Sequence, residues 1–423
     1  MSAANHTFRA FRSRNYRLFF CGQSLSQIGT WMQRTGVSWV VYTMTHSAFM
    51  LGLTMFALQF PSFALTLFGG IVSDRYSRYK TLFITQVLSM VQAIALTVLV
   101  LFTHYQIWQI LALSVFLGII NAFDVPVRQP MVHEMIQDKE DLPSALAFNS
   151  AMNNIARLIG PALSGIVLEA FGAGICFALN AVSFIAVIGS LLLMKLPPYQ
   201  PNSVRKKVVH ELKEGFVYLV RTPSIGLVLL MLAIVSLFVL PYNTLLPIFA
   251  KVIYKGNAAT FGYINSFIGL GAIIGTFYLA SLNPGTNMRR VLLVNTIIFG
   301  IGLICFSQIN SFPIAMAFAV LCGFGTMSQT TVANTIIQAG AAKNMRGRVM
   351  SYLSLGFFGM MPFGGLLTGS ISQVIGAQTT LLCQGIMALV ITAAFSGFLR
   401  SNTMDLKEKE ELEVAQEEAI KEV

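Results

Sequence analysis

Four charged side chains stand inside or at the edge of long apolar stretches of this sequence: Arg34, Asp124, Arg157 and Glu169. A charge in apolar surroundings is costly, so it usually serves binding or pairs with another charge. A guanidinium group carries several hydrogen-bond donors and a permanent positive charge, which suits it to carboxylates and other anions. The two arginines therefore indicate an anion-binding site. The alternative is that either arginine reaches the membrane surface or neutralises an acid such as Glu169.

Catalysis has no candidates in this sequence. No histidine falls inside a stretch that we expect to cross a membrane, no nucleophile can be paired with a base, and the phosphate-binding pattern Gly-x-x-x-x-Gly-Lys-Ser/Thr is absent. The five cysteines stand singly in apolar runs without Cys-x-x-Cys spacing, which indicates core residues. We therefore expect no enzyme activity, no metal site and no cofactor.

Composition indicates that lipid is the solvent of this chain. Of its 423 residues, 55% are hydrophobic and 11% charged, and the mean hydropathy is +0.70. The apolar blocks, set apart by charged residues, cover 18–73, 81–123, 142–194, 222–288, 291–342 and 349–399. Each block has room for two helices of about 20 residues, the length that crosses a bilayer. The sequence thus predicts an all-α membrane protein with about twelve transmembrane helices in two six-helix halves.

The positions of the basic residues give an orientation. The formal net charge is +11, and lysine and arginine mark the cytoplasmic loops of membrane proteins. Basic residues fall in alternate loops; they include Arg9, Arg12, Arg14, Arg17, Arg75, Arg78, Lys80, Arg128, Lys139, Lys195, Arg289, Arg290, Lys343, Arg346 and Arg348. The opposite loops hold Lys251 and Lys255. We expect both termini in the cytoplasm and no nucleic-acid partner.

Two related halves are expected on either side of a polar linker. The predicted units are an N-terminal half (1–194), a cytoplasmic linker with an interfacial helix (195–222), a C-terminal half (223–400) and a charged cytoplasmic tail (401–423). A shift of about 205 residues places Gly118 on Gly323 and Gly70 on Gly275.

Three sequence patterns resemble the major facilitator superfamily of transporters. "GGIVSDRYSRYK" (69–80), between the second and third spans, resembles the superfamily's Gly-x-x-x-Asp-Arg-x-Gly-Arg signature, with a serine at position 77 in place of glycine. "ARLIGPALSG" (156–165) in the fifth span is similar to its antiporter motif, and "GTWMQR" (29–34) with "NAFDVPVRQP" (121–130) resembles the branch of enterobactin exporters and macrolide efflux pumps. The matching antiporter-motif residues are Gly160, Pro161 and Gly165.

The resemblance implies a cytoplasmic gate at the first pattern, formed by Gly70, Asp74, Arg75, Arg78 and Asp124. We expect Gly70 to let the second and eleventh spans approach closely. Asp74 would face the positive N-terminal end of the eleventh span, and Arg78 would reach an acid of the fourth span, for which Asp124 is the candidate. The alternative is that these charges only set the topology, which explains Arg75 as well.

A substrate site is expected midway across the membrane. Arg34 lies about 25 Å along the first span and Arg157 about 20 Å along the fifth, and both share helical stripes with polar residues. The predicted binding residues are Gln23, Gln27, Trp31, Arg34, Asn153, Arg157, Tyr242, Asn243 and Gln329. Further aromatic residues, Trp39, Tyr42, Phe56 and Phe60, fit ligand binding or helix packing, and the polar residues fit substrate contacts or hydrogen bonds between helices.

These features predict a monomeric exporter in the bacterial inner membrane that works by alternating access. Deep arginines favour an anionic or amphipathic small molecule, such as a siderophore or a macrolide-like drug. The resemblance implies coupling to the proton gradient, for which Asp124 and Glu169 are the membrane-embedded carboxylates. The alternatives are an importer or lipid flippase of the same fold, or a membrane receptor that binds a ligand without moving it.

Overall fold

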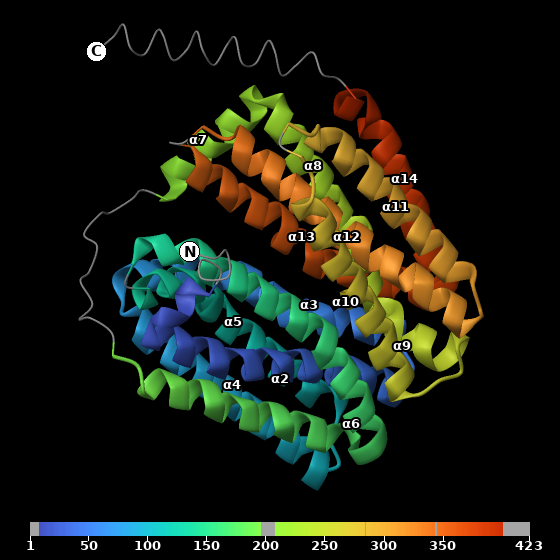
Figure 1. Ribbon diagram of the computed structural model, residues 1–423. Helices are drawn as coiled ribbons and strands as arrows, with labels where there is room; N and C mark the ends of the chain where they lie inside the picture. Colours follow the sequence, from blue (N-terminus) through green and yellow to red (C-terminus); the bar gives the residue numbers. More distant parts are fainter. Residues whose placement is uncertain (1–7, 137, 196–207, 284, 343–344, 401–423) are drawn as a thin grey trace, which may run out of the picture.

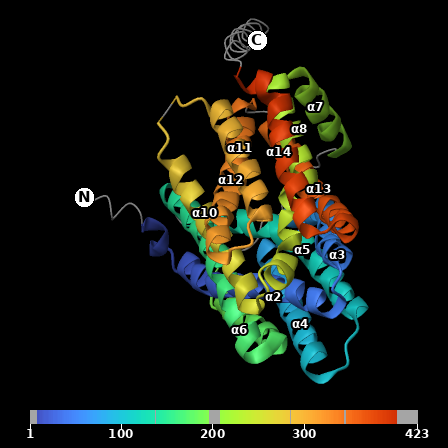
Figure 2. The same cartoon turned by 90° about the vertical axis from the view of Figure 1, so that its right-hand side faces the viewer.

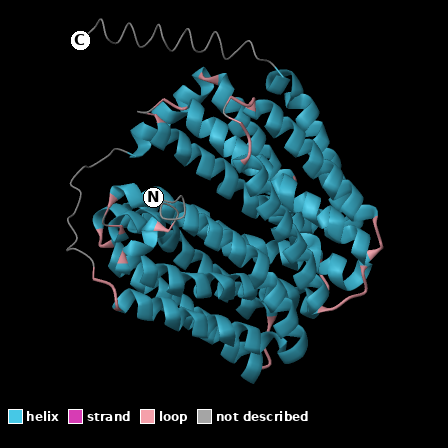
Figure 3. Cartoon of the chain, viewed as in Figure 1, coloured by secondary structure: helices cyan, strands magenta, loops and turns pink. Residues whose placement is uncertain are grey.

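The computed structural model describes residues 8–136, 138–195, 208–283, 285–342 and 345–400, and these residues form helices joined by short loops (Figure 3). The described residues contain no β-strand, so the predicted all-α class is confirmed. The predicted tail, 401–423, and residues 196–207 of the predicted linker lie outside the described residues.

The first group contains five long helices, and three of them begin at a serine cap. After a short turn at Arg9–Arg12 come α2 (Arg14–Thr45), α3 (Ala48–Arg75), α4 (Arg78–Phe102), α5 (Ile107–Met135) and α6 (Leu142–Leu192). The side chains of Ser13, Ser47 and Ser77 each accept a hydrogen bond from a backbone N–H in the first turn of α2, α3 and α4. Such caps satisfy donors that the helix cannot, so each serine fixes where the next helix starts.

α6 turns back on itself. It has 51 residues, whereas about 20 suffice to cross a bilayer, and it leaves helical geometry at Gly172, whose φ is +82°. Glycine adopts positive φ without a steric cost. Near the start of α2, Ala10 N donates to Ser144 Oγ at 3.5 Å and Asn15 Nδ2 to Lys195 O at 2.8 Å. Both ends of α6 therefore lie beside the start of α2, as its two antiparallel limbs require (Figure 1).

The second group begins with α7 (Val208–Arg221) and α8 (Pro223–Phe238) and continues through the irregular turns η3 (Leu240–Leu245), α9 (Leu246–Ile248) and η4 (Phe249–Ile253). Pro241 and Pro247 lack the backbone N–H that a regular helix needs, and they fall at these irregular turns. The remaining helices are α10 (Ala258–Ala280), α11 (Met288–Gln308), α12 (Phe312–Gly340), α13 (Arg346–Ile375) and α14 (Ala377–Arg400).

Ten stretches of the described residues are long and apolar enough to cross a membrane. They comprise the helices α3 to α6, the continuous stretch Pro223–Ile253, and α10 to α14. α2 has the length, 32 residues, but carries Gln23, Gln27 and Arg34 among its polar side chains.

The two groups of helices touch each other near one end of the molecule. Figures 1 and 2 show α2–α6 on one side and α8–α14 on the other, with α3 beside α13 and α6 beside α10. A Cβ added at Gly52 of α3 would lie 2.5 Å from Gly365 O of α13, and one at Gly262 of α10 would lie 2.6 Å from Pro161 O of α6. We call these two contacts the glycine seam.

The opposite end, which we call the basic end, carries Arg12, Arg75, Arg78, Arg290 and Arg348. The helices of the two groups diverge toward it (Figure 1). A Cβ added at Gly70 would meet no atom within 4 Å, and the same holds at Gly347. The prediction that Gly70 brings the second and eleventh spans together is therefore wrong for this structure, in which Gly52 lies at the close contact of the same two helices.

α7 lies along the basic end and is tied to the second group. Arg348 Nη1 lies 2.7 Å from Glu214 Oε2, and Ala342 N donates to Tyr218 Oη at 3.2 Å. A helix was expected in this part of the linker, and its position at the membrane surface stays a prediction.

Buried amide side chains connect three helices of the first group. Gln33 Nε2 donates to Gln92 Oε1 at 2.9 Å, and Asn180 Nδ2 donates to Gln33 Oε1 at 2.7 Å. All three side chains are buried. Because unpaired amides in a buried position are costly, this chain of hydrogen bonds holds α2, α4 and α6 in one register.

Candidate functional site

Trp31 lies between two arginines. The guanidinium carbon of Arg34, on the same helix, is 5.3 Å from the centre of the Trp31 ring, and that of Arg157, on α6, is 5.2 Å from it. A cation this close to an indole ring is attracted to its π electrons. The structure thus brings together three of the residues predicted to bind substrate.

The guanidinium groups of Arg34 and Arg157 are not neutralised by an acid among the described residues. The Arg34 side chain is exposed and that of Arg157 is half-buried, although both belong to the middle of long helices. Among the described residues, neither guanidinium lies within salt-bridge distance of a carboxylate. Neutralisation by Glu169, the alternative considered for these residues, is therefore not observed. A third arginine, Arg128 of α5, is close enough to Arg34 to interact with it electrostatically.

The Gly-Pro motif of α6 makes room for this cluster. A Cβ added at Gly160 would lie 2.5 Å from the Cβ of Trp31, so the absence of a side chain lets α2 and α6 approach here. Four residues further on, Ser164 Oγ donates to Met32 O at 3.0 Å in a buried position. Pro161 and Gly165 face α10 at the glycine seam. The motif therefore packs α6 against α2 on one side and α10 on the other.

The second group of helices lies across from the cluster. Tyr242 of η3 is close enough to Arg157 to interact with it electrostatically. Toward the glycine seam, Trp39 stacks on Phe261 of α10, with ring centres 5.9 Å apart, and Lys251 Nζ lies 5.9 Å from the centre of the Trp39 ring. The cluster thus lies between the two groups of helices and is closed on the seam side by aromatic contacts.

Several predicted binding residues lie elsewhere. Gln23 and Gln329 are 1% and 0% exposed, so solvent in the open space cannot reach them in this structure. Gln27 is half-buried, and Asn153 and Asn243 are exposed, but within the part of the chain that the structure describes, no hydrogen bond or ring contact joins these three to Trp31. Of the other aromatic residues, Phe56 and Phe60 stack on each other and touch Phe363 of α13. These contacts favour helix packing, one of the two roles expected for these residues.

Arg78 pairs with an acid at the basic end, although not with the acid that we expected. Arg78 Nη1 lies 2.7 Å from Glu134 Oε1 of α5, and Arg78 Nε donates to Ser73 O at 3.3 Å. The expected pairing of Arg78 with Asp124 is wrong, because α5 continues to Met135 and brings Glu134 to the level of Arg78. The apolar block ends at 123, so sequence reasoning stopped the helix too early; Pro126 and Pro130 are accommodated inside it.

Asp124 is paired with Arg128 instead, one helical turn away. Its Oδ1 also accepts hydrogen bonds from Thr85 Oγ1 at 2.8 Å and Gln86 Nε2 at 2.7 Å. Sequence reasoning assigned Arg128 to a loop. The signal that could have found the pair is the spacing of Asp124 and Arg128, four residues apart in "FDVPVR", which puts both on one helix face.

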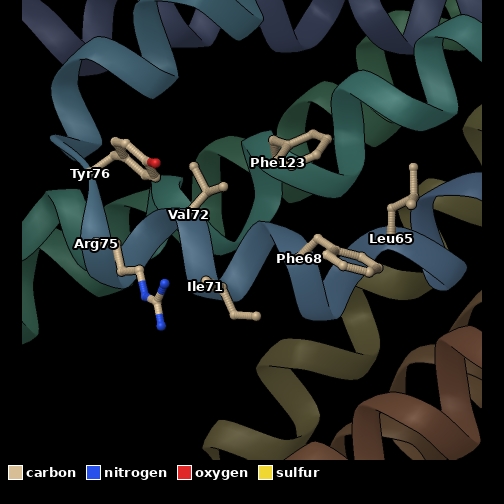
Figure 4. A pocket seen from close by; sticks show the side chains of 7 residues that line it. All are labelled: Leu65, Phe68, Ile71, Val72, Arg75, Tyr76 and Phe123. Carbon is tan, nitrogen blue, oxygen red and sulfur yellow. The ribbon is translucent and has the colours of Figure 1, made fainter. Parts of the chain in front are cut away.

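The remaining residues of the predicted gate lie at the surface. Asp74 and Arg75 are exposed at the end of α3. Arg75 borders an apolar hollow of about 450 Å³ formed by α3, Tyr76 and Phe123 of α5. Figure 4 shows Arg75 and Tyr76 at one end of this hollow and Leu65 at the other. The gate role of Gly70, Asp74, Arg75 and Arg78 stays a prediction.

Comparison with known proteins relates the whole chain to bacterial transporters. A family model described as transmembrane secretion effector matches residues 5–423. The chain is 28% identical over 397 residues to the staphyloferrin A transporter of Staphylococcus aureus, covering 93% of this chain and 98% of that protein. It is 22% identical over 383 residues to the multidrug efflux pump Tap of Mycolicibacterium fortuitum, covering 88% and 92%. Identity to the enterobactin exporter EntS of Salmonella typhi is 26% over 341 residues, covering 79% and 80%.

Solved structures share the fold. A POT family transporter in complex with 5-aminolevulinic acid superimposes with a TM-score of 0.72 at 14% identity, covering 92% of this chain and 97% of that one. A bacterial homologue of the human lysosomal transporter Spinster, in an inward-facing and unoccupied conformation, gives a TM-score of 0.71 at 13% identity, covering 91% and 97%. The family model and the relatives confirm the predicted superfamily, and they confirm the prediction that the protein is a transporter and not an enzyme. The chain belongs to the transmembrane secretion effector family of the major facilitator superfamily and is a membrane transporter.

Proposed function

We propose that this protein exports a small anionic or amphipathic molecule from the cytoplasm by alternating access. The observation that carries the proposal is the cluster of Trp31 between Arg34 and Arg157, with no acid beside either arginine among the described residues. Guanidinium groups bind carboxylates and phenolates through charge-assisted hydrogen bonds, and the indole ring offers an apolar face. A cationic substrate would need a carboxylate at this place.

The proposed topology has twelve crossings and both termini in the cytoplasm. It adds α2 and the second limb of α6 to the ten apolar stretches. The halves are residues 1–194 and 223–400, joined by the linker 195–222 and followed by the tail 401–423. Support comes from the basic residues at one end and from the turn at Gly172, which makes two antiparallel limbs of α6.

In this topology the structure is the state that faces the cytoplasm. The glycine seam closes the outer end, and the open surroundings of Gly70 and Gly347 lie at the basic, cytoplasmic end. A substrate could then reach Arg34 from the cytoplasm. Rocking of one half on the other would open the glycine seam and bring the basic ends together.

The proposed substrate class is that of siderophores or macrolide-like drugs. The relatives that support it are a staphyloferrin A transporter, a multidrug efflux pump and enterobactin exporters. The proton gradient is the expected energy source, and the carboxylate that carries the proton stays open. We propose that one chain suffices for transport. The alternatives are an importer, a lipid flippase and a receptor without transport, and the experiment below separates the importer and the receptor from the exporter.

The test is uptake into inside-out vesicles that contain the protein and carry an imposed proton gradient. The compounds are a catecholate siderophore, a carboxylate siderophore, a macrolide and a cationic dye. We expect gradient-dependent accumulation of an acidic siderophore. Arg34→Ala should lower that accumulation at least about tenfold, because it removes a charge-assisted contact. Arg290→Ala is the matched control, since Arg290 is an exposed arginine of the basic end.

Each outcome of this test has a distinct meaning. Accumulation of the cationic dye alone would contradict the anion site. Binding of an acidic compound without accumulation would favour a receptor, and accumulation in vesicles of the opposite orientation would favour an importer. Equal loss in Arg34→Ala and Arg290→Ala would show that any change of charge disturbs transport, and the assignment of Arg34 would fail.

A further inference from the structure

Asp124 is a buried carboxylate that pairs neither with Arg78 of the predicted gate nor with Arg34 or Arg157. Its side chain is 2% exposed, and it lies about 16 Å along α5 from the end of the helix at Met135. Thr85 and Gln86 of α4 each donate a hydrogen bond to its Oδ1, and Arg128 contacts its Oδ2. A carboxylate this deep in a membrane protein is expensive to keep, so its retention calls for a function.

The fold itself does not require a charge at this position. The repeat shift of about 205 residues places Asp124 on Gln329 of α12. The two helices are packed alike, since Gly118 of α5 lies against Leu58 O and Gly323 of α12 against Ile268 O. Gln329 is fully buried and neutral. The equivalent position in the second half thus packs without a charge, and the acid in the first half serves something that the second half lacks.

Arg128 connects Asp124 to the substrate site. Its side chain is 28% exposed while that of Asp124 is 2% exposed, so the guanidinium lies between the buried acid and the open space. Arg128 is also close enough to Arg34 to interact with it electrostatically. Its Nε is buried and has no hydrogen-bond partner in the structure. Arg128 therefore contacts the acid with one nitrogen, while its Nε is a buried donor without a partner in this arrangement.

The groups around Asp124 leave Arg128 as its counter-charge. From α4 it meets the neutral side chains of Thr85 and Gln86. From α3, Ser73 donates to the backbone oxygen of Pro126. On α2, Arg34 interacts electrostatically with Arg128 and with Arg157 of α6. Every other charge named here is positive, so the ionised carboxylate offsets one of three arginines.

We propose that Asp124 masks Arg128, and that loss of the negative charge on Asp124 frees Arg128 to bind the substrate anion as a third arginine. Arg128 is then a specificity residue, and Asp124 a positioning residue that acts through it. This inference rests on the proposed anion site.

The sign of the effect follows from the charges. The ionised carboxylate of Asp124 offsets the positive charge of Arg128, so an anion binds more weakly beside the intact ion pair and more tightly where Asp124 carries no charge. Asp124 therefore tunes substrate loading through Arg128.

The experiment measures anion binding to the purified full-length protein in detergent by isothermal titration calorimetry. The probes are citrate, a tricarboxylate, and 2,3-dihydroxybenzoate, a catechol carboxylate. Asp124→Asn keeps an oxygen that can accept from Thr85 and Gln86 and removes the charge. An unmasked charge about 10 Å from a bound anion, at an effective dielectric constant of about 20, strengthens binding about tenfold. We expect that increase for Asp124→Asn and a loss for Arg128→Gln.

The matched control is Glu169→Gln, which makes the same charge change at an exposed residue of α6, about 18 Å along the helix from Arg157. It should leave the affinity within about twofold of the wild type. The double variant Asp124→Asn with Arg128→Gln should lose the gain of the single variant, because the gain acts through Arg128. Melting temperatures of all variants check that they fold.

The outcomes separate this inference from the proposed function. Tighter binding in Asp124→Asn, and not in Glu169→Gln, supports masking. Equal or weaker binding in a folded Asp124→Asn protein overturns it, even where the wild type binds the probes well. A gain that persists in the double variant also overturns it. If neither the wild type nor Asp124→Asn binds either probe, the anion site itself is refuted.

Discussion

A single added methyl group at Gly52 should shift the protein out of the cytoplasm-facing state. In the structure, the Cβ of Gly52→Ala would lie 2.5 Å from Gly365 O and 3.2 Å from Gly369 Cα. Favourable contacts of a carbon atom lie near 3.5 Å, so α3 and α13 must separate by about an ångström. Overpacking of this kind costs about 1–3 kcal/mol, which corresponds to a factor of about 5 to 150 in the ratio of the two states.

The cost falls on one state only. When the glycine seam opens, the added methyl group has room, and the higher helix propensity of alanine is common to both states. We expect the population with closed basic ends to grow by the factor above. Spin labels at Tyr76, directly after α3, and at Ser351 of α13, both exposed near the basic end, report the separation of the two halves by pulsed electron paramagnetic resonance.

The result that refutes this reasoning is an unchanged distance distribution. Gly189→Ala is the control, because a Cβ at this helical glycine meets no atom within 4 Å, and it should leave the distribution as in the wild type. A shift of equal size in both variants would show that helix propensity, not the seam, sets the balance. A longer distance in Gly52→Ala would contradict the assignment of the seam to the closed end.

Three further variants test other parts of the structure. Glu134→Gln should lower the melting temperature by only a few degrees, because its ion pair with Arg78 is half-exposed and such pairs contribute about 0–1 kcal/mol; a large drop would mean that the pair holds the fold. Gln33→Leu should cost about 2 kcal/mol or more in chemical unfolding, because it removes the partner of the buried Gln92 Oε1 and of the buried Asn180 Nδ2, and an unchanged midpoint would contradict this. Trp31→Ala should weaken binding of 2,3-dihydroxybenzoate about tenfold through the loss of its ring contacts, and unchanged affinity would remove Trp31 from the site.

Much of this fold could be predicted from the sequence, because lipid imposes strict rules. Apolar stretches that must cross a bilayer form helices, and basic residues accumulate on one side. The long helices, two crossings within the block 142–194 and a helix in the linker 195–222 were predicted, whereas the position of the turn at Gly172 comes from the structure. The end of α5 does not, because charged residues from Asp124 onward continue a helix that remains inside the protein. A run of apolar residues identifies the part of a helix that faces lipid. Asp124 does not face lipid, because it contacts Arg128, Thr85 and Gln86 inside the protein.

The candidate site was predictable in part for a related reason. Arg34, Trp31 and Arg157 stand out because charges and indole rings are rare in the middle of apolar helices. Their contact depends on how α2 and α6 pack, which Gly160 permits. The partner of Arg78 could not be deduced, since Glu134 becomes a neighbour only through the crossing of α4 and α5. The burial of Gln329 likewise depends on the packing of the second half.

The distribution of contact types fits a protein that must exist in two states. At the glycine seam, small residues let backbones touch, and few polar contacts cross it, such as the one from Ser47 Oγ to Gln373 Oε1 at 2.9 Å. Contacts of this kind separate at low cost because they leave few polar groups unpaired. The costly interactions, Gln33 with Gln92 and Asp124 with Arg128, lie within one group of helices. Each half can therefore move as a rigid body while its strongest contacts persist, and the charge that the substrate meets at Arg128 is set inside that half.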